Sequence, residues 1–293
     1  MAVNIDLMSQ KPTIADFKKI IWAYYRREGR TSLPWRRTRD PYAILISEVM
    51  LQQTQVTRVA EYYKKFLEQF PNVRALAGAR TSDVLAAWQG LGYNRRAVFL
   101  KRTAEIVTRD FDGRLPDDRE ALELLPGIGK GTSGSLMAFA FNKPEVFIET
   151  NIRRVFIHFF FPRRRRVTDV ELERYIESSV DKKNPREWYW ALMDYGAAMN
   201  TAGAAMPGRR AVAKASNPNR RSAHYKKQSA FAGSDRELRG KILRSTLSIE
   251  GSKISAARLQ KKLAIPATRF KKIIAGLEKE GFIVRKGNYI CIK

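Results

Sequence analysis

The stretch LLPGIGKGTSGS (residues 124–135) lies between two segments whose apolar residues recur with helical spacing. Gly127 and Gly129 permit a tight turn there, because glycine lacks the Cβ atom that restricts the backbone elsewhere. A turn of this kind before a helix can bring bare backbone N–H groups up to a phosphate. The alternative is a purely structural turn between two helices. The phosphate interpretation predicts contact with a phosphodiester backbone that does not depend on base sequence.

The charge of the chain favours such a partner. Its 293 residues include 55 Lys and Arg against 29 Asp and Glu, which gives a formal net charge of +26. Basic side chains displace counterions from nucleic acid and so drive association with it. A solvated surface can also be basic, but solubility needs far less charge. We therefore expect nucleic acid as the partner, with the basic excess greatest in residues 206–293.

Helical periodicity dominates the first two thirds of the chain. It predicts helices at 13–29, 42–59, 60–69, 81–89, 94–110 and 118–125, then from the glycine turn to 141, and at 150–160, 169–180 and 186–199. Strand-like alternation is nearly absent before residue 200. This part is therefore expected to be all-α.

The last third of the chain changes character. Residues 206–233 hold Arg220 and Arg221 and no acidic residue, which predicts a basic linker or arm that contacts DNA. Residues 234–293 combine helical spacing with the alternating segment FIVRKGNYICIK (residues 282–293), which is typical of a hairpin. The pattern predicts a winged-helix (α+β) domain whose helix from about Pro266 presents Arg269 and Lys272 to DNA. A winged helix can also bind protein instead.

Cysteine content and hydropathy limit the remaining classes. Cys291 is the single cysteine, so neither an internal disulfide nor a thiolate metal centre can be built. The longest apolar run, residues 155–161, is far too short to span a bilayer. We expect an intracellular monomer, in the cytoplasm or at the nucleoid, with no bound metal and no membrane contact.

One carboxylate stands alone in an apolar segment. In PYAILISEVMLQQTQVT (residues 41–57) the only charged residue is Glu48. An apolar environment disfavours the ionised form and can hold a proton near neutral pH, as a general acid requires. The alternative is that Glu48 lies on the polar face of an amphipathic helix.

Five motifs occur in a characteristic order: LPWR, SEVMLQQTQV, GLGYNRRA, LPGIG and ALMDYGA. Over about residues 20–200 the chain thereby resembles the MutY-type A/G-specific adenine glycosylases of the endonuclease III superfamily. The resemblance implies an all-α, two-lobed helix–hairpin–helix glycosylase fold. Its core would be residues 1–205, with a six-helix lobe at about 33–142 and a second lobe from 1–32 plus 143–205. A linker at 206–233 and the winged-helix domain at 234–293 would follow.

The resemblance also implies roles for particular residues. Glu48 corresponds to the acid that protonates the departing purine. Tyr93 corresponds to the aromatic residue that intercalates beside the partner base. The wedge that replaces the extruded base would be Leu51, Gln53 and Thr54; the hairpin contacts would be Gly127, Gly129, Lys130 and Thr132; the base pocket would include Leu33, Trp35, Arg36 and Trp190.

A second carboxylate is needed to stabilise the cationic sugar as the glycosidic bond breaks. Where the family has an aspartate, this chain has Glu149, followed by Asn151, which is the family's asparagine. We expect Glu149 to stabilise the cation and Asn151 to position water or the carboxylate. The alternative is a salt bridge between Glu149 and Arg153.

The chain departs from the family in four further places. Gly131 stands where lyase members have a nucleophilic lysine, which indicates hydrolysis by water. The usual cluster-ligand spacing falls on Pro207, Arg210 and Ser216, so a protein without an iron–sulfur cluster is expected. Trp190 replaces a residue associated with reading adenine. The winged helix stands in place of the domain that reads 8-oxoguanine.

Three functions follow from these features. The first is a monofunctional glycosylase for adenine opposite 8-oxoguanine or guanine. The second is a glycosylase for mismatched thymine or uracil, suggested by Trp190 and the missing lesion-reading domain. The third is a non-catalytic protein that binds damaged DNA, suggested by Glu149 and the absent cluster ligands.

Overall fold

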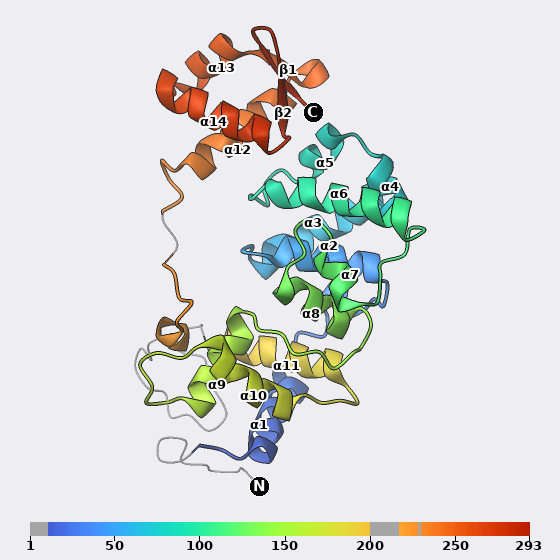
Figure 1. Cartoon of the computed structure of the whole chain (residues 1–293), viewed down its shortest axis with the longest axis vertical. Helices are drawn as coiled ribbons and strands as arrows, with labels where there is room; N and C mark the ends of the chain where they lie inside the picture. The colour runs from blue at the N-terminus through green and yellow to red at the C-terminus, as the bar shows by residue number, and fades with distance from the viewer. Residues whose placement is uncertain (1–10, 200–216, 228–229) are drawn as a thin grey trace. The chain divides into compact units, whose positions relative to one another are not determined.

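The computed structural model describes residues 11–199, 217–227 and 230–293, and these are mostly helical (Figure 1). The chain divides into two compact units. The first comprises residues 1–41, 117–119 and 129–227, and the second comprises residues 42–116, 120–128 and 228–293. Each unit has its own hydrophobic core.

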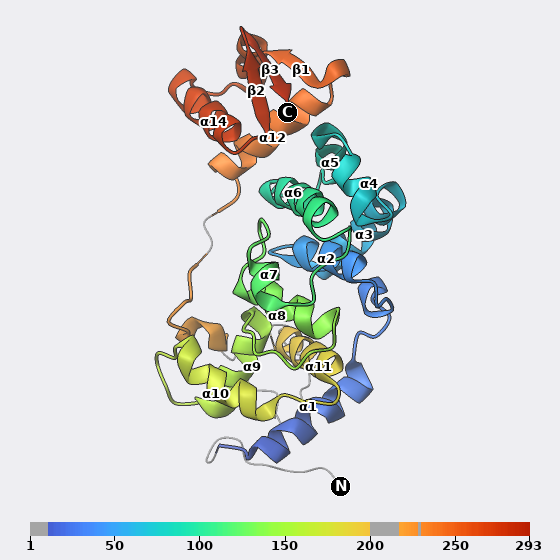
Figure 2. The same ribbon diagram turned by 45° about the vertical axis from the view of Figure 1, so that its right-hand side comes forward.

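The first unit is a cluster of helices around aromatic side chains. Figures 1 and 2 both place α1, α9, α10 and α11 side by side. The ring of Phe17 on α1 lies 5.1 Å from the rings of Phe156 and Phe160 and 5.9 Å from Trp188. Edge-on contacts of this kind add to the free energy gained by burying the rings. The elements are α1(Ile14–Glu28), η1(Pro34–Arg36), α8(Lys130–Phe139), α9(Thr150–Phe160), α10(Asp169–Ser179), α11(Pro185–Ala198) and η2(Pro218–Arg221).

The second unit begins with a deeply buried helix. Its elements before the C-terminal domain are α2(Pro41–Leu51), α3(Val56–Gln69), α4(Val73–Gly78), α5(Thr81–Ala87), α6(Arg95–Asp110) and α7(Arg119–Glu123). The predicted single helix over 42–59 is wrong, because the chain breaks into α2 and α3 at residues 52–55. Gln53 has a φ of 57° there, which a right-handed helix cannot contain.

The C-terminal domain has the predicted winged-helix pattern. Its elements are α12(Asp235–Leu247), η3(Glu250–Ser252), β1(Lys253–Ser255), α13(Ala256–Leu263), α14(Ala267–Lys279), β2(Ile283–Lys286) and β3(Tyr289–Ile292). The strands form an antiparallel sheet in the order β1-β3-β2, visible beside α12 in Figure 2. Gly287, with a φ of 58°, turns the chain between β2 and β3. The hairpin and the helix from Pro266 are confirmed; the short strand β1 was not predicted.

The boundaries of the units differ from those expected in two places. Residues 33–41 and 129–142, expected in the six-helix lobe, belong to the first unit. Residues 217–227, expected in the linker, also pack there: Val167 and Ser222 form a parallel bridge beside η2. No helix in the described part of the chain has both the length and the apolar character that crossing a bilayer requires.

Candidate nucleic-acid interface and active site

The glycine turn is exposed and directly precedes α8. Gly127 has a φ of 80°, and a Cβ atom there would lie 2.9 Å from the ring of Phe99, so the position needs glycine for two reasons. Gly129 is the N-cap of α8, and its residue type supplies no side chain to bind the first N–H groups of the helix. Lys130 and Gly131 are exposed and Thr132 is half-buried. The first N–H groups of α8 are therefore free of a side-chain cap, and phosphate binding at this turn stays a prediction.

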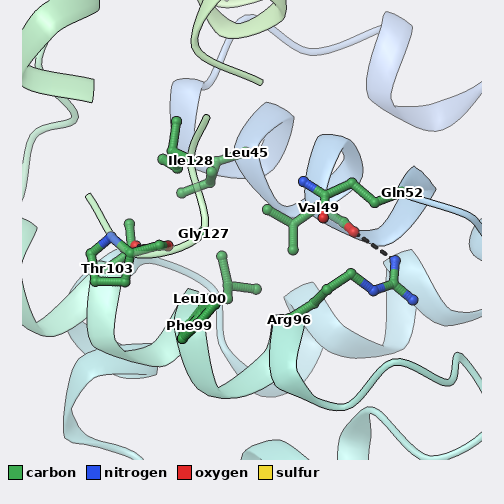
Figure 3. Close-up of a pocket in the computed structure, with 10 residues that line it drawn as sticks. Leu45, Val49, Gln52, Arg96, Phe99, Leu100, Thr103, Gly127 and Ile128 are labelled. Carbon is green, nitrogen blue, oxygen red and sulfur yellow. Dashed lines mark hydrogen bonds between the residues drawn. The ribbon is translucent and has the colours of Figure 1, made fainter. Parts of the chain in front are cut away.

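The space beneath this turn is too small for a base. It is lined by residues of α2, α6 and the turn, among them Val49, Phe99 and Gly127 (Figure 3). Its volume is about 20 Å³. That is room for about one water molecule, so this cavity is a packing feature of the lobe.

Arg96 at the edge of the cavity joins two loops to the end of α2. Its buried guanidinium donates hydrogen bonds of 2.7–3.2 Å to four carbonyls and one hydroxyl, those of Val49, Met50, Leu91, Gly92 and Thr54. Burial lowers the pKa of Arg96 to about 10. Sequence reasoning missed this residue, although it is the second arginine of GLGYNRRA.

The two loops that Arg96 joins each carry an exposed tip with strained backbone. Gln53 has a φ of 57° and Tyr93 a φ of 47°, in the left-handed region that residues other than glycine rarely occupy. Tyr93 is a large aromatic side chain that is 36% exposed. Strain of this kind, at a cost of about 1–3 kcal/mol, concentrates at functional sites. Gln53 and Tyr93 therefore have the exposure that a wedge requires, and Leu51 and Thr54 beside Gln53 are half-buried.

Glu48 lies near the end of α2. Every residue of α2 is buried or half-buried, and Glu48 is its only charged side chain. Pro41, Glu48 and Leu51 are the half-buried residues of the helix, so Glu48 is partly exposed and the polar-face alternative stays open. A carboxyl group in such a helix needs a function or a polar partner.

Glu149 is the N-cap of α9. Its Oε1 accepts hydrogen bonds from the backbone N–H groups of Asn151 at 2.6 Å and Ile152 at 2.9 Å. Burial nevertheless raises the pKa of Glu149 and outweighs these bonds, which favour the ionised form. The alternative of a salt bridge with Arg153 is wrong, because Arg153 pairs with Asp169 at 2.7 and 2.8 Å.

Asn151 is held in place from two sides. The buried Arg154 donates to its Oδ1 at 2.8 Å and also to the carbonyl of Gly196 on α11. A Cβ atom on Gly196 would lie 2.5 Å from the backbone oxygen of Asn151. The glycine of ALMDYGA thus lets α11 approach the start of α9, and Arg154 is a further residue that sequence reasoning missed.

The predicted base-pocket residues form a buried ionic and aromatic arrangement in the first unit. Arg36 donates to both carboxylate oxygens of Asp194, at 2.7 and 2.8 Å, and Arg30 adds a bond of 2.7 Å. Burial alone would raise the pKa of Asp194, but these arginines lower it. The indole of Trp190 stacks on Phe139 with centroids 5.8 Å apart, and Arg36 lies 5.3 Å from the indole centroid.

Trp35 and Leu33 complete that predicted set. Trp35 is buried and Leu33, the N-cap of η1, is half-buried. Asp194 was not singled out from the sequence, although its place in ALMDYGA was quoted. Two like-charged arginines and one carboxylate in a buried site indicate that Arg36 fastens the fold of this unit.

The remaining predicted DNA contacts divide into free and engaged side chains. Arg220 and Lys272 are exposed. Arg221 donates to the carbonyls of Phe161 and Pro162, so its side chain anchors η2 to the first unit. Arg269 donates to Asp235 at 2.8 Å and to the carbonyl of Gly233 at 2.7 Å, which fastens the start of α12.

The candidate residues are divided between the two units. Glu149, Asn151 and the base-pocket set belong to the first, and Glu48, Gln53 and Tyr93 belong to the second. That Glu48 and Glu149 act on the same nucleotide stays a prediction. Within residues 11–199, 217–227 and 230–293, no group of three or more His, Cys, Asp and Glu is placed to hold a metal ion. The expected cluster positions Pro207, Arg210 and Ser216 lie outside the described residues.

Comparison with known proteins relates the chain to DNA repair proteins. Residues 46–182 match the family described as HhH-GPD superfamily base excision DNA repair protein. An adenine DNA glycosylase of Buchnera aphidicola is 37% identical over 182 residues, 62% of this chain and 52% of the relative. The chain thus spans about half the length of the first curated relatives it matches.

Two other matches cover most of the relative. A thymine/uracil-DNA glycosylase of Pyrobaculum aerophilum is 34% identical over 203 residues, 67% of this chain and 88% of the relative. A solved thermostable thymine-DNA glycosylase is 31% identical, with a TM-score of 0.57 over 63% of this chain and 86% of that one.

Proposed function

The chain belongs to the HhH-GPD superfamily of base excision DNA repair proteins, and on that premise we propose that it is a monofunctional DNA glycosylase. Its proposed substrate is a mismatched adenine opposite 8-oxoguanine or guanine, extruded from double-stranded DNA. The reaction is hydrolysis of the bond between that base and its sugar.

One observation carries the proposal. Glu48 is the only charged residue of a helix whose residues are all buried or half-buried, and four residues later the chain enters the loop with Gln53 at its exposed tip. A wedge that empties the base stack therefore lies next in sequence to an acid that can protonate the extruded base. Protonation lets the base depart neutral, which lowers the barrier to breaking the glycosidic bond.

Glu149 stabilises the sugar cation in this mechanism. Its Oε1 is bound by two backbone N–H groups, which fixes the carboxylate before the substrate arrives. A preorganised carboxylate in a partly desolvated site attracts a developing positive charge more strongly than one in water. Asn151, held by Arg154, orients the carboxylate through its Nδ2, which lies 3.4 Å from Oε2 of Glu149.

Water is the proposed nucleophile. Gly131, on the first turn of α8, has no side chain that could attack the sugar, and its neighbour Lys130 is exposed. The single cysteine also supports function without an iron–sulfur cluster, because such a cluster needs four ligands of which cysteine is the usual one. Arg221 donates to the carbonyls of Pro162 and Arg164 and so anchors η2 within the first unit.

The test is base release from an A:8-oxoguanine duplex, with alkali to cut the abasic product. Glu48→Gln keeps the shape of the side chain but cannot donate a proton as an acid does, so the single-turnover rate should fall by about 10²–10⁴-fold. Full activity of this variant would reject the mechanism. Wild-type activity only on other mismatches would reject the substrate.

A second substrate class is supported by the Pyrobaculum relative, whose name is thymine/uracil-DNA glycosylase. Trp190 adds to it, because a buried indole stacked on Phe139 stands where adenine-reading members have a polar side chain. A panel of G:T, G:U, G:A and A:8-oxoguanine duplexes separates the two. Tight mismatch binding with no base released from any of them would favour the non-catalytic function.

A further inference from the structure

The second unit contains a large groove that extends from the loops of Gln53 and Tyr93 to the winged-helix domain. It is lined by residues 52–55 after α2, residues 89–96 before and at the start of α6, and one face of α12 in the winged-helix domain. Its volume is about 1120 Å³. Pockets for small molecules have volumes of roughly 300–1,000 Å³, so this groove is of a size that suits part of a polymer.

The walls of the groove are basic. The cations on them include Arg58, Arg95 and, from α12, Arg236, Lys241 and Arg244, against two acidic residues, Glu237 and Glu280. Lys241 pairs with Glu237 at 2.8 Å. The exposed Arg244 has no ion-pair partner among the described residues. The lining thus has a net positive charge, and the side chain of Arg244 is available to bind an anion.

Exposed aromatic rings accompany this charge. Phe231 before α12 is 62% exposed and Tyr93 is 36% exposed, and both line the groove. Basic side chains follow a phosphate backbone, and aromatic rings offer faces on which bases stack, so the two together are typical of nucleic-acid binding. A surface that binds protein would have fewer charged residues at its centre.

The winged-helix domain also touches the loop tip directly. Arg236 on α12 donates a hydrogen bond of 2.5 Å to the hydroxyl of Tyr93, and its guanidinium lies 5.6 Å from the centre of that ring. A second connection runs through Glu280 at the end of α14. Its carboxylate lies 3.8 Å from Arg95, and its carbonyl accepts from Arg102 on α6. The position of Tyr93 therefore depends on a residue of the C-terminal domain.

The helix expected to read DNA contributes less to this surface. On α14, Arg269 is engaged with Asp235 and Gly233, and neither it nor Lys272 lines the groove. We propose that the groove binds the backbone of duplex DNA, with α12 rather than α14 supplying the contacts of the winged-helix domain and Arg236 positioning Tyr93. This rests on the proposed function only in the choice of DNA as the probe.

The test compares two charge reversals in the full chain. Arg244→Glu changes the α12 wall, and the control Lys272→Glu makes the same change on α14; both side chains are exposed in the same domain. Binding to a fluorescent A:8-oxoguanine duplex and to its matched counterpart is measured by anisotropy across a salt series. We expect Arg244→Glu to weaken both complexes about tenfold and to lower the salt slope by about 1, with Lys272→Glu close to wild type.

Two outcomes would overturn the proposal. A larger loss in Lys272→Glu than in Arg244→Glu would assign the contact to α14. Wild-type affinity in both variants would remove the domain from the DNA interface. Thermal unfolding of each variant shows that it is folded. Because binding is measured apart from base release, a wild-type protein that binds but excises nothing would refute the proposed function and leave this comparison valid.

The positioning role of Arg236 has its own measurement. Arg236→Ala, Tyr93→Phe and the double variant form a thermodynamic cycle for mismatch binding, because Tyr93→Phe removes the hydroxyl and keeps the ring. We expect the double variant to lose no more affinity than Arg236→Ala alone. Losses that simply add would mean that Arg236 acts on DNA without Tyr93.

Discussion

At the start of α9, one glutamate both caps a helix and carries the proposed catalytic charge. Glu149 accepts from two N–H groups of its own helix, a capping role that was not predicted from the sequence. The resemblance indicated the residue. The structure shows that it forms no ion pair with Arg153, because Asp169 binds Arg153 instead. Which of two neighbouring charges forms an ion pair depends on which helices pack together. A short stretch of sequence does not contain that information.

Glu149→Gln should raise stability at neutral pH while it abolishes base release. A carboxyl group whose pKa is raised in the folded state stabilises the fold at pH values below its ordinary pKa of 4.5. This contribution to the free energy of unfolding is lost as the pH rises through the raised pKa. Gln keeps an oxygen for the two N–H groups and has no charge to desolvate. Urea unfolding at pH 5 and pH 8 measures this. The free energy of unfolding of the variant should rise relative to that of wild type as the pH increases. A variant that is less stable at pH 8 would contradict the burial of the charge.

Asp194 is predicted to be the most sensitive carboxylate of the first unit. Asp194→Asn leaves Arg36 buried without its partner, and removal of one member of a buried ion pair costs about 3–5 kcal/mol. The free energy of unfolding by urea measures this. Glu68→Gln, which breaks the exposed pair of Glu68 with Lys64, is the control and should change little. Equal effects of the two substitutions would contradict a fastening role for Asp194.

At the scale of elements, periodicity predicted the long helices well. The predicted helices at 94–110, 150–160, 169–180 and 186–199 agree with α6, α9, α10 and α11 to within a residue or two. It failed at residues 52–55, because apolar and neutral residues run through that break without a Gly or Pro to mark it. The break is fixed by Arg96, which binds the last carbonyls of α2 from more than 40 positions away along the chain.

The contact between α9 and α11 gives a prediction for glycine. Gly196→Ala would place a methyl group 2.5 Å from the backbone oxygen of Asn151, so the helices must separate, at a cost of about 1–3 kcal/mol. Base release should fall as well, because Asn151 moves. Gly240→Ala in α12 is the matched control: no atom lies within 4 Å of its new methyl group, and helix propensity should raise stability by about 1 kcal/mol. Thermal unfolding of both variants measures this. A Gly196→Ala variant with an unchanged melting temperature would contradict the close approach of α9 and α11.

At the scale of the molecule, the sequence predicted the fold class and the two kinds of domain. It placed a winged helix after a helix–hairpin–helix core, and it gave most candidate residues through five motifs. It could not give the groove or the contact of Arg236 with Tyr93, because residues 143 positions apart meet there. It also assigned DNA binding to α14 by analogy with other winged helices, whereas the cations that the winged-helix domain contributes to the groove lie on α12.

The absence of four cysteines leads to a prediction for the purified protein. Protein produced in medium depleted of iron should have the same melting temperature and the same rate of base release as protein from iron-rich medium. Its visible spectrum should lack the broad absorption of an iron–sulfur cluster. Iron bound in stoichiometric amount, lost together with activity on chelation, would refute the proposal of a glycosylase without a cluster.

The guanidinium of Arg96 has a consequence for how such a protein would inspect DNA. One buried cation binds both the loop of Gln53 and the loop of Tyr93, so the distance between the two tips cannot change unless several hydrogen bonds break together. Because the two loops are held rigidly together, the DNA duplex must deform for both tips to enter it. Base steps that unstack easily would admit both tips, and well-paired steps would resist them. The protein would then respond to how easily the double helix deforms before any base enters a pocket.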